Sequence, residues 1–361
     1  MSTLANMRFQ DRVGAEFRQW AERLDGPPQL AGHHDADGLS ALACLARAWE
    51  RRYGMRPATR IVGRGENVWT PEFGDTLADD LHGLVLLDLG VGAARPTSAS
   101  LCVIDHHVPS EAPDDGRLVL SGDGESVVPS TSLIAWWAAR GLFDDPAEVD
   151  DLVWLAAVGA VGDMADAGFP AIDRAKKAFY VTKIREVVSL VNAPRRSASG
   201  DAFPALAWLL AAHSPKDALT GDYPERAACE AARAEVKVAA AQGRRAPPRF
   251  GERYGSGLAI IRVDTPCQVH PLIAQSWAGR LKPAICFAAN AEIEPGRVSF
   301  SGRTRGERSI VEFLAAHAPP GVDRTRYGNG HPKAAGGSLT HAQWNAWVDA
   351  LGFDGSVRVD A

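Results

Sequence analysis

The chain has 361 residues, of which 46% are hydrophobic and 23% charged, and its formal net charge is −5 at pH 7. These values are typical of globular proteins and exclude a disordered chain, and the length is sufficient for two domains with separate cores. The acidic total also excludes a globally basic nucleic-acid binder, so any nucleic acid would have to bind through a local basic groove and bound cations.

The cysteine pattern and the N-terminus indicate the compartment. The five cysteines are widely spaced, and no Cys-x-x-Cys pair occurs, which argues against both a disulfide scaffold and a zinc knuckle. The N-terminus lacks the basic and then apolar layout of a secretory signal, and no apolar run is long enough to span a membrane. We therefore expect a soluble, cytoplasmic protein with no membrane partner.

Short apolar runs alternate with amphipathic segments in the first part of the chain. The predicted elements are a helix over residues 8–25, a strand at 30–31, a helix from Gly38, and strands at 61–62, 84–87 and 101–104. Continuous apolar strands that alternate with helices indicate a parallel sheet covered on both faces. In such sheets ligands bind at the carboxyl ends of the strands.

Helices are predicted to dominate the middle of the chain. Residues 130–132 (Ser-Thr-Ser) are typical of a helix N-cap. Helical patterns follow at 133–137, 149–158, 176–191 and 225–241, and the last of these, rich in Ala and charges, has the character of a connecting helix.

A change of composition at residues 243–248 marks a boundary, after which the alternation restarts. The predicted elements are a strand at 258–263, a helix at 271–281, strands at 284–288 and 297–301, a helix at 309–317 and a Gly-rich loop at 328–337. We therefore expect an α/β protein with a first domain over 1–220, a helical linker over 221–250 and a smaller mixed-sheet domain over 251–361.

Carboxylates and imidazoles gather where the predicted strands end. The run His33-His34-Asp35-Ala36-Asp37-Gly38 precedes a helix, Asp88 ends one strand, Asp105-His106-His107 ends the next, and Asp163 follows an apolar helix. Ionisable side chains at the end of a buried strand are costly unless they bind something. Carboxylate together with imidazole suits divalent Mn, Zn or Fe.

Simpler readings exist for each of these motifs. Asp35, Asp88 or Asp163 could each cap a helix, and a His pair could pack in a core. A cap does not explain the neighbouring His and second Asp of the first run, and the recurrence of the motif favours metal binding. His34 lies between the alternating ligands and is expected to point away.

The candidate ligands exceed what one ion needs, because a catalytic zinc has only three protein ligands. A surplus favours two divalent ions, which clamp a phosphodiester and generate hydroxide near neutral pH, and which share a carboxylate, here Asp88. The predicted metal ligands are His33, Asp35, Asp37, Asp88, His106, His107 and Asp163, and the predicted catalytic residues are Asp88, Asp105, His106 and His107.

Two Gly-containing segments of the second domain carry basic side chains. Glycine allows the backbone to approach a ligand closely, and Arg makes bidentate phosphate contacts. The alternative is an exposed turn with solvated charges, and a His at a helix start is often structural. The candidates for phosphate binding here are His270, Arg303, Arg305, Gly330, His331, Lys333 and Gly336.

The ordered motifs HHDADG, LLDLG, IDHH, GAVGD and GHPKAAGG resemble those of the DHH phosphoesterase superfamily with its DHH-associated C-terminal domain. The resemblance covers nearly the whole chain. It implies two α/β domains that face each other across a cleft, a dinuclear Mn²⁺ (or Mg²⁺) site in the first, and a Gly-rich substrate-gripping loop in the second.

Within the superfamily the chain is most similar to the RecJ-like branch of single-strand-specific 5′-3′ exonucleases. Residues 33–38 match its Asp-Tyr-Asp-x-Asp-Gly run, with His33 in place of the first Asp, as in archaeal RecJ-like proteins. Residues 192–196 resemble its Asn-Ala-x-Gly-Arg stretch with Arg195 in place of Gly, which makes Arg196 a substrate-binding candidate. The segment from His270 to Leu281 resembles one that begins His-Glu-Gly-Val. We expect no counterpart of the OB-fold domain that full-length bacterial RecJ carries.

The resemblance implies a phosphodiesterase that releases nucleoside monophosphates from the 5′ end of single-stranded DNA, RNA or short oligonucleotides by attack of metal-bound hydroxide. His107 would hold or polarise the phosphate, and Arg303, His331 and Lys333 would grip it. A small-substrate relative, acting on nanoRNA, dinucleotides or phosphoadenosine phosphate, would share every metal ligand. A non-catalytic partner in a replication or repair assembly would be expected to have a degraded ligand set, whereas the set here is complete.

Overall fold

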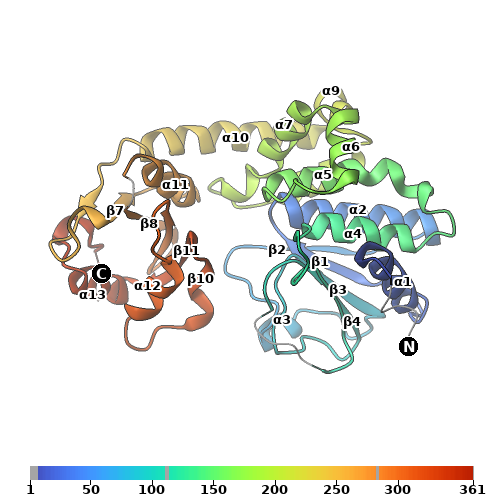
Figure 1. The fold of residues 1–361 in the computed structure, drawn as a ribbon, viewed down its shortest axis with the longest axis horizontal. Coiled ribbons are helices and arrows are strands. Elements are labelled where there is room, and N and C mark those ends of the chain that lie inside the picture. Colours follow the sequence, from blue (N-terminus) through green and yellow to red (C-terminus); the bar gives the residue numbers. More distant parts are fainter. Residues whose placement is uncertain (1–6, 110–113, 282–283, 361) are drawn as a thin grey trace. The chain divides into compact units, whose positions relative to one another are not determined.

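The computed structural model of the chain describes residues 7–109, 114–281 and 284–360, which form two compact units, each with its own sheet (Figure 1). Unit 1 comprises Met1–Arg195 and Gly200–Ala231, and unit 2 comprises Arg196–Ser199 and Ala232–Ala361. The division falls within the long helix α10 (Pro224–Gly243). The prediction of two α/β domains is confirmed.

Unit 1 is built on a five-stranded parallel sheet with the strand order β2-β1-β3-β4-β5. Its strands are β1 (Gln29–His33), β2 (Thr59–Val62), β3 (Gly83–Leu87), β4 (Ser100–Asp105) and β5 (Leu118–Ser121). Every residue of β3 is buried, as expected for a central strand that is covered on both faces. The parallel sheet was predicted, whereas the edge strand β5 was not.

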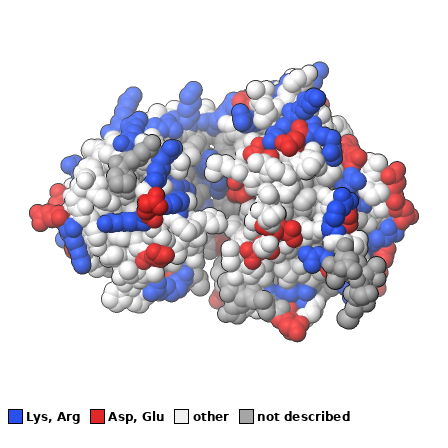
Figure 2. All heavy atoms as spheres, in the orientation of Figure 1, with Lys and Arg blue, Asp and Glu red and all other residues white. Residues whose placement is uncertain are grey.

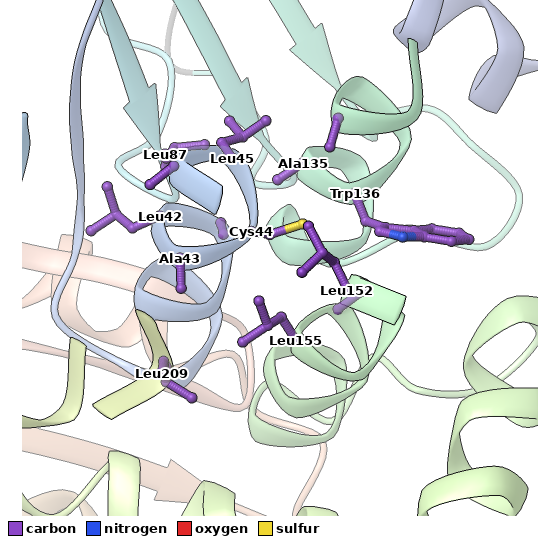
Figure 3. Packing of buried hydrophobic residues seen from close by; sticks show 14 of the residues in the cluster. Leu42, Ala43, Cys44, Leu45, Leu87, Ala135, Trp136, Leu152, Leu155 and Leu209 are labelled. Carbon is purple, nitrogen blue, oxygen red and sulfur yellow. The ribbon is translucent and has the colours of Figure 1, made fainter. Parts of the chain in front are cut away.

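The two faces of this sheet pack against different layers. On one face, Val85 and Leu87 join the larger core with α1 (Phe9–Ala21), α2 (Ala36–Tyr53), α4 (Thr131–Gly141) and α5 (Val153–Gly162). Figure 3 shows Leu87 beside side chains of α2 and α4. On the other face, Leu84 and Leu86 pack in a smaller core beside α3 (Pro71–Gly74). The alternation follows from the two-residue period of a strand.

The remaining helices of unit 1 complete its helical side. They are α6 (Pro170–Phe179), α7 (Val181–Val191), α8 (Phe203–Ala211) and α9 (Pro215–Thr220), with 3₁₀ segments at Pro146–Leu152 and Pro194–Arg196. The helical region predicted over 176–191 is therefore interrupted. The break lies at Tyr180, which has a left-handed φ of 63° and cannot continue an α-helix.

Unit 2 contains a six-stranded mixed sheet with the order β10-β11-β9-β8-β7-β6, in which only β7 and β8 pair in parallel. Its strands are β6 (Arg249–Phe250), β7 (Leu258–Val263), β8 (Ile285–Glu294), β9 (Arg297–Thr304), β10 (Tyr327–His331) and β11 (Ala334–Thr340). Its helices are α11 (His270–Arg280), α12 (Ile310–Ala316) and α13 (His341–Ala350), with 3₁₀ segments at Gly255–Gly257, Arg324–Arg326 and Gly355–Val357. One face packs an aromatic core that includes Phe287, Phe300 and Trp344, and the other packs Ile261 with α10 and α11.

The Gly-rich segment at 328–337 is not the predicted loop. It forms the antiparallel hairpin β10–β11, in which Gly330 pairs with Ala335. Glycine is required here, because Gly330 has a φ of 133° and an ideal Cβ would lie 2.3 Å from the Ala334 carbonyl oxygen. No helix in the described ranges is long and apolar enough to cross a membrane.

Candidate metal centre

The ends of three neighbouring strands gather ionisable side chains at one edge of the unit 1 sheet. Strand β1 ends at His33, β3 ends just before Asp88, and β4 ends at Asp105. Since β3 pairs in parallel with both β1 and β4, these three carboxyl ends lie side by side. The position is the one where open parallel sheets bind ligands.

Seven of the predicted side chains form three overlapping groups. The groups are His33, Asp35 and Asp88; Asp88, His106 and His107; and Asp37, His106 and Asp163. In each group the candidate ligand atoms lie within 4.8 Å of one another. Asp88 and His106 each belong to two groups, so the three groups form one connected cluster.

Asp88 lies between the groups. Its Oδ2 atom is 3.6 Å from His33 Nδ1, and its Oδ1 atom is 3.6 Å from His106 Nε2 and 4.0 Å from His107 Nδ1. The residue has a left-handed φ of 63°, which is unfavourable for a residue with a side chain. Backbone strain of this kind persists where the surroundings fix it, often at functional sites.

Asp35 acts as a helix cap and as a member of a metal-ligand group at once. Its Oδ1 atom accepts hydrogen bonds from the amides of Asp37 and Gly38 at the start of α2 (3.1 and 3.2 Å). Its Oδ2 atom remains 3.1 Å from His33 Nδ1. The two sequence interpretations of this carboxylate are therefore compatible, because each uses a different oxygen.

The N-terminus of α4 holds Asp37 in place. The Asp37 carboxylate accepts hydrogen bonds from the amides of Thr131 (2.8 Å) and Ser132 (3.0 Å), where the helix dipole favours negative charge. The Thr131 hydroxyl donates to Asp88 (3.1 Å). Ser130 is the helix cap, as predicted, and accepts from the Leu133 amide.

Sequence reasoning missed the roles of several residues around these ligands. Thr131 and Ser132 were read only as part of a cap. Gly159 of α5 leaves no room for a side chain, since an ideal Cβ would lie 2.4 Å from Asp37 Oδ1. The Asn192 side-chain oxygen accepts from the Ala36 amide (3.2 Å) and from Arg195 Nε (2.9 Å). The sequence features that could have revealed these roles are the three hydroxyl residues at 130–132 and Gly159, the first glycine of GAVGD.

Asp105 orients its neighbour and belongs to none of the three groups. It is completely buried, and its carboxylate accepts from the amides of Gly90 (2.7 Å) and His107 (2.6 Å). His107 Nδ1 lies 2.9 Å from Asp105 Oδ1, and such a carboxylate fixes the tautomer and orientation of an imidazole. His34 also lies outside the groups, with its Nδ1 2.9 Å from the Val62 carbonyl oxygen.

The crowding of carboxylates in the cluster favours a bound cation. Burial, together with Asp35 and Asp37, raises the pKa of Asp88 well above its usual range. Burial and the charges of Asp37 and Asp35 likewise raise the pKa of Asp163 to about 7. Burial opposes protonation of His33, yet Asp35 and Asp88 raise its pKa to about 10. Crowded carboxylates with imidazoles are a donor set that fits divalent metal ions.

The predicted substrate-binding residues lie in unit 2, around the β10–β11 hairpin and around the start of α11. Arg303 on β9 pairs in register with Ala334 on β11, and its guanidinium donates to Ser301 Oγ and the Gly302 carbonyl, each at 2.8 Å. Lys333 in the hairpin turn donates to the Gly306 carbonyl. His331, Lys333 and Arg305 are exposed.

Three other candidates, Gly336, His270 and Arg196, also lie in unit 2. An ideal Cβ on Gly336 would lie 2.3 Å from the Phe300 carbonyl oxygen, so this position requires glycine for close strand pairing. His270 is the first residue of α11 and is buried. The Arg196 carbonyl accepts from the Gln268 amide (2.8 Å), which brings Arg196 to the loop before α11.

The comparisons with known proteins show the fold. No protein-family model and no curated protein sequence matches the chain. Among solved structures it is similar to RecJ from Thermus thermophilus in complex with Mn²⁺, with 18% identity and a TM-score of 0.68, covering 97% of this chain and 55% of that one. Exonuclease RecJ bound to manganese has 20% identity, a TM-score of 0.64, and coverage of 98% and 95%.

A third similar structure is the DHH domain of a protein described as a member of the s1p family of ribosomal proteins. It has 14% identity and a TM-score of 0.61, and the match covers 95% of this chain and 87% of that one. The chain thus spans little more than half the length of the Thermus RecJ but nearly all of the other two. At these identities the likeness establishes a shared fold.

Proposed function

We propose that this chain, which has the RecJ-like fold of the DHH phosphoesterase superfamily, is a metal-dependent phosphodiesterase. Its substrates would be single-stranded DNA or RNA or short oligonucleotides, from whose 5′ end it would release nucleoside monophosphates. The observation that carries the proposal is the convergence of seven ligand-type side chains in three groups, of which two contain Asp88 and two contain His106.

The residues fit two divalent cations, with Mn²⁺ the first candidate and Mg²⁺ the second. His33, Asp35, Asp37, Asp88, His106, His107 and Asp163 would hold them. When bound, such a pair clamps a phosphodiester and lowers the pKa of water at the site. Asp88 would act as the shared carboxylate, because its two oxygens face different groups.

Asp105 would contribute by positioning. Its hydrogen bond to His107 Nδ1 (2.9 Å) fixes the ring and, although burial opposes it, raises the pKa of His107 to about 9. A ring oriented in this way can bind a cation in its neutral form or, when protonated, donate to a phosphate oxygen and stabilise charge that develops on it, but it cannot do both at once. His107 would therefore polarise the substrate phosphate.

The charge of the two units supports a polyanionic substrate. Unit 2 has 18 Lys and Arg against 11 Asp and Glu, whereas unit 1 has 21 against 33. The overall charge of −5 therefore conceals a basic unit, and Figure 2 shows Lys and Arg spread over unit 2 on the face that it displays. Arg196, His270, Arg303, Arg305, Gly330, His331, Lys333 and Gly336 remain the proposed phosphate contacts there.

The test is hydrolysis by purified, metal-free protein titrated with Mn²⁺ or Mg²⁺. Three 5′-phosphorylated substrates are compared: a long single-stranded DNA, an RNA of two to five nucleotides, and a dinucleotide. Digestion of the DNA to mononucleotides would support the exonuclease, and turnover of only the short substrates would restrict the proposal to nanoRNA or dinucleotides. Activity on none of them, or full activity in Asp105→Ala, would contradict it.

A further inference from the structure

A cavity of about 750 Å³ lies on the helical side of unit 1, lined by residues of α1, α4, α5 and α6. Its volume is within the range of small-molecule sites. None of its lining residues belongs to the metal centre. The cavity involves the C-terminal half of α4, whereas the N-terminus of α4 contacts Asp37, so the two sites lie toward opposite ends of one helix.

The wall of the cavity is aromatic. Trp136, Trp137, Phe143, Phe169 and Phe179 all line it, and the rings of Trp137 and Phe169 meet edge to face with centroids 6.2 Å apart. The Trp136 indole N–H is used within the protein, because it donates to the Val149 carbonyl (3.1 Å). A wall of this kind favours a planar, apolar ligand body.

Trp137 differs from Trp136 in having an unused donor. The residue is only 9% exposed, yet its indole N–H has no hydrogen-bond partner within the described ranges of the chain. The N–H is not among the fully enclosed, unpaired polar atoms, so it keeps some accessible surface, and Trp137 lines the cavity. Buried Trp usually finds an acceptor for this group, and a ligand could supply one.

The charged groups of the lining do not balance. Arg8 pairs with Asp11 (2.8 Å), and Arg140 pairs with Asp150 and lies over the Trp136 ring. Arg174 has no ion-pair partner among the residues that the structure describes. Burial lowers the pKa of the Arg140 guanidinium, and although the Asp145 charge opposes this, the Arg174 charge adds to it. With three Arg and two Asp, the lining has one excess positive charge.

We propose that this cavity is a second ligand site, for a small monoanion with an aromatic body. The anionic group would pair with Arg174, the body would lie against Trp137 and Phe169, and a polar atom would accept from the Trp137 indole. An Arg guanidinium beside aromatic faces suits such a ligand, since it both pairs with the anion and stacks on the ring. The proposal does not depend on the phosphodiesterase activity.

The test uses 8-anilinonaphthalene-1-sulfonate, an aromatic monoanion whose fluorescence rises in apolar surroundings, titrated against the full, metal-free chain. We expect one saturable site per chain, with energy transfer from tryptophan. The neutral analogue N-phenyl-1-naphthylamine should bind roughly fivefold or more weakly, because it cannot pair with the guanidinium.

Three variants locate the site. Ala178→Trp fills the cavity from an exposed position on α6 and should weaken sulfonate binding roughly tenfold or more. Arg174→Gln, also at an exposed position, should weaken it roughly fivefold. The matched control Arg185→Gln, at an exposed position on α7 outside the cavity, should leave it unchanged.

Melting temperatures close to that of the parent would show that the variants are folded. If Ala178→Trp does not fold, the difference in sulfonate affinity between Arg174→Gln and Arg185→Gln still tests the proposal. Absence of a saturable one-to-one site, equal loss in both Arg variants, or equal affinity for the neutral analogue would overturn the proposal.

Discussion

Asp88 concentrates several unfavourable features in one residue. It is buried, it has a left-handed φ of 63°, and the charges of Asp35 and Asp37 oppose its ionisation. Such a residue is retained at the expense of stability, which is common where a site is built for function.

Replacing this carboxylate should separate stability from activity. Asp88→Asn keeps the shape and tolerates the left-handed backbone, and it removes the repulsion. We expect metal-free Asp88→Asn to be at least as stable as the parent chain at pH 8 in urea unfolding, while Mn²⁺-dependent hydrolysis falls by about 100-fold or more. A stable variant with parental activity would contradict the shared-carboxylate role.

A second residue-scale feature supports the loop that follows Asp88. The Arg117 side chain is completely buried and donates to the carbonyls of Gly92 (2.8 Å), Ala93 (3.2 Å) and Ala94 (3.0 Å). Asp115 is its carboxylate partner, with Oδ1 2.8 Å from Arg117 Nε. The pair ties this loop to the strand β5, so the loop geometry depends on it.

The pair should give stability a defined pH dependence. Hydrogen bonding to Arg117 holds the pKa of Asp115 well below its usual range, so its contribution is present above about pH 4 and is lost as the pH falls further. We expect Asp115→Asn to lower the free energy of unfolding by about 1 kcal/mol at pH 7, with the difference shrinking toward pH 2. Asp114→Asn, at the neighbouring exposed position, is the control and should show no such trend.

At the scale of elements, the contact between α4 and α5 sets the position of Asp37. Gly159 of α5 faces the first turn of α4, and an ideal Cβ there would lie 2.1 Å from Ser132 Oγ and 2.4 Å from Asp37 Oδ1. Contacts under 3 Å require something to move. The close approach of these two helices therefore depends on one glycine.

Gly159→Ala should displace the Asp37 carboxylate. We expect destabilisation of about 1–3 kcal/mol and weaker Mn²⁺ binding, measured by calorimetry. Adding Ser132→Ala removes the clash with Oγ, so it should restore part of the stability but not the metal affinity. Gly279→Ala on α11, where a Cβ meets nothing within 4 Å, is the control. Full rescue of metal binding by the second substitution would show that only helix packing is involved.

At the scale of the molecule, the two units have separate hydrophobic cores. The cores that include Leu42 and Leu86 lie within unit 1, and those that include Phe300 and Ile261 lie within unit 2. The three candidate metal groups all lie in unit 1. A ligand that binds only the folded form of one unit stabilises that unit directly.

Metal addition and removal should therefore act on one unit. In scanning calorimetry of the full chain we expect two transitions, and Mn²⁺ should move one of them to a higher temperature. At 100 times its dissociation constant, Mn²⁺ should increase the free energy of unfolding of that unit by about 2.7 kcal/mol. Chelation should reverse the shift. Asp88→Asn should abolish it without moving the other transition. Equal stabilisation of both transitions by Mn²⁺ would contradict a metal site confined to unit 1.

The sequence by itself determined the central strands of the unit 1 sheet, β1, β3 and β4, and the candidate ligands at their ends. Short apolar runs such as residues 84–87 are typical of buried strands, and the polar residues directly after such strands lie at the sheet edge. That local rule was enough to predict His33, Asp88 and Asp105 at one edge, and it led to the two α/β domains. The rule succeeded because the burial of a strand and the position of its end both depend on only a few neighbouring residues.

Only the tertiary structure decided which distant residues complete the centre. The amides of Thr131 and Ser132, the bare Cα of Gly159 and the side chain of Asn192 act across gaps of about 90 to 160 residues, and no local pattern predicts which helix end meets which carboxylate. The same holds for the β10–β11 hairpin, where pairing with β9 overrides the loop preference of its glycines, and for the cavity beside Trp137. These features arise from packing between elements that are distant in the sequence, so they can be seen only in the folded structure.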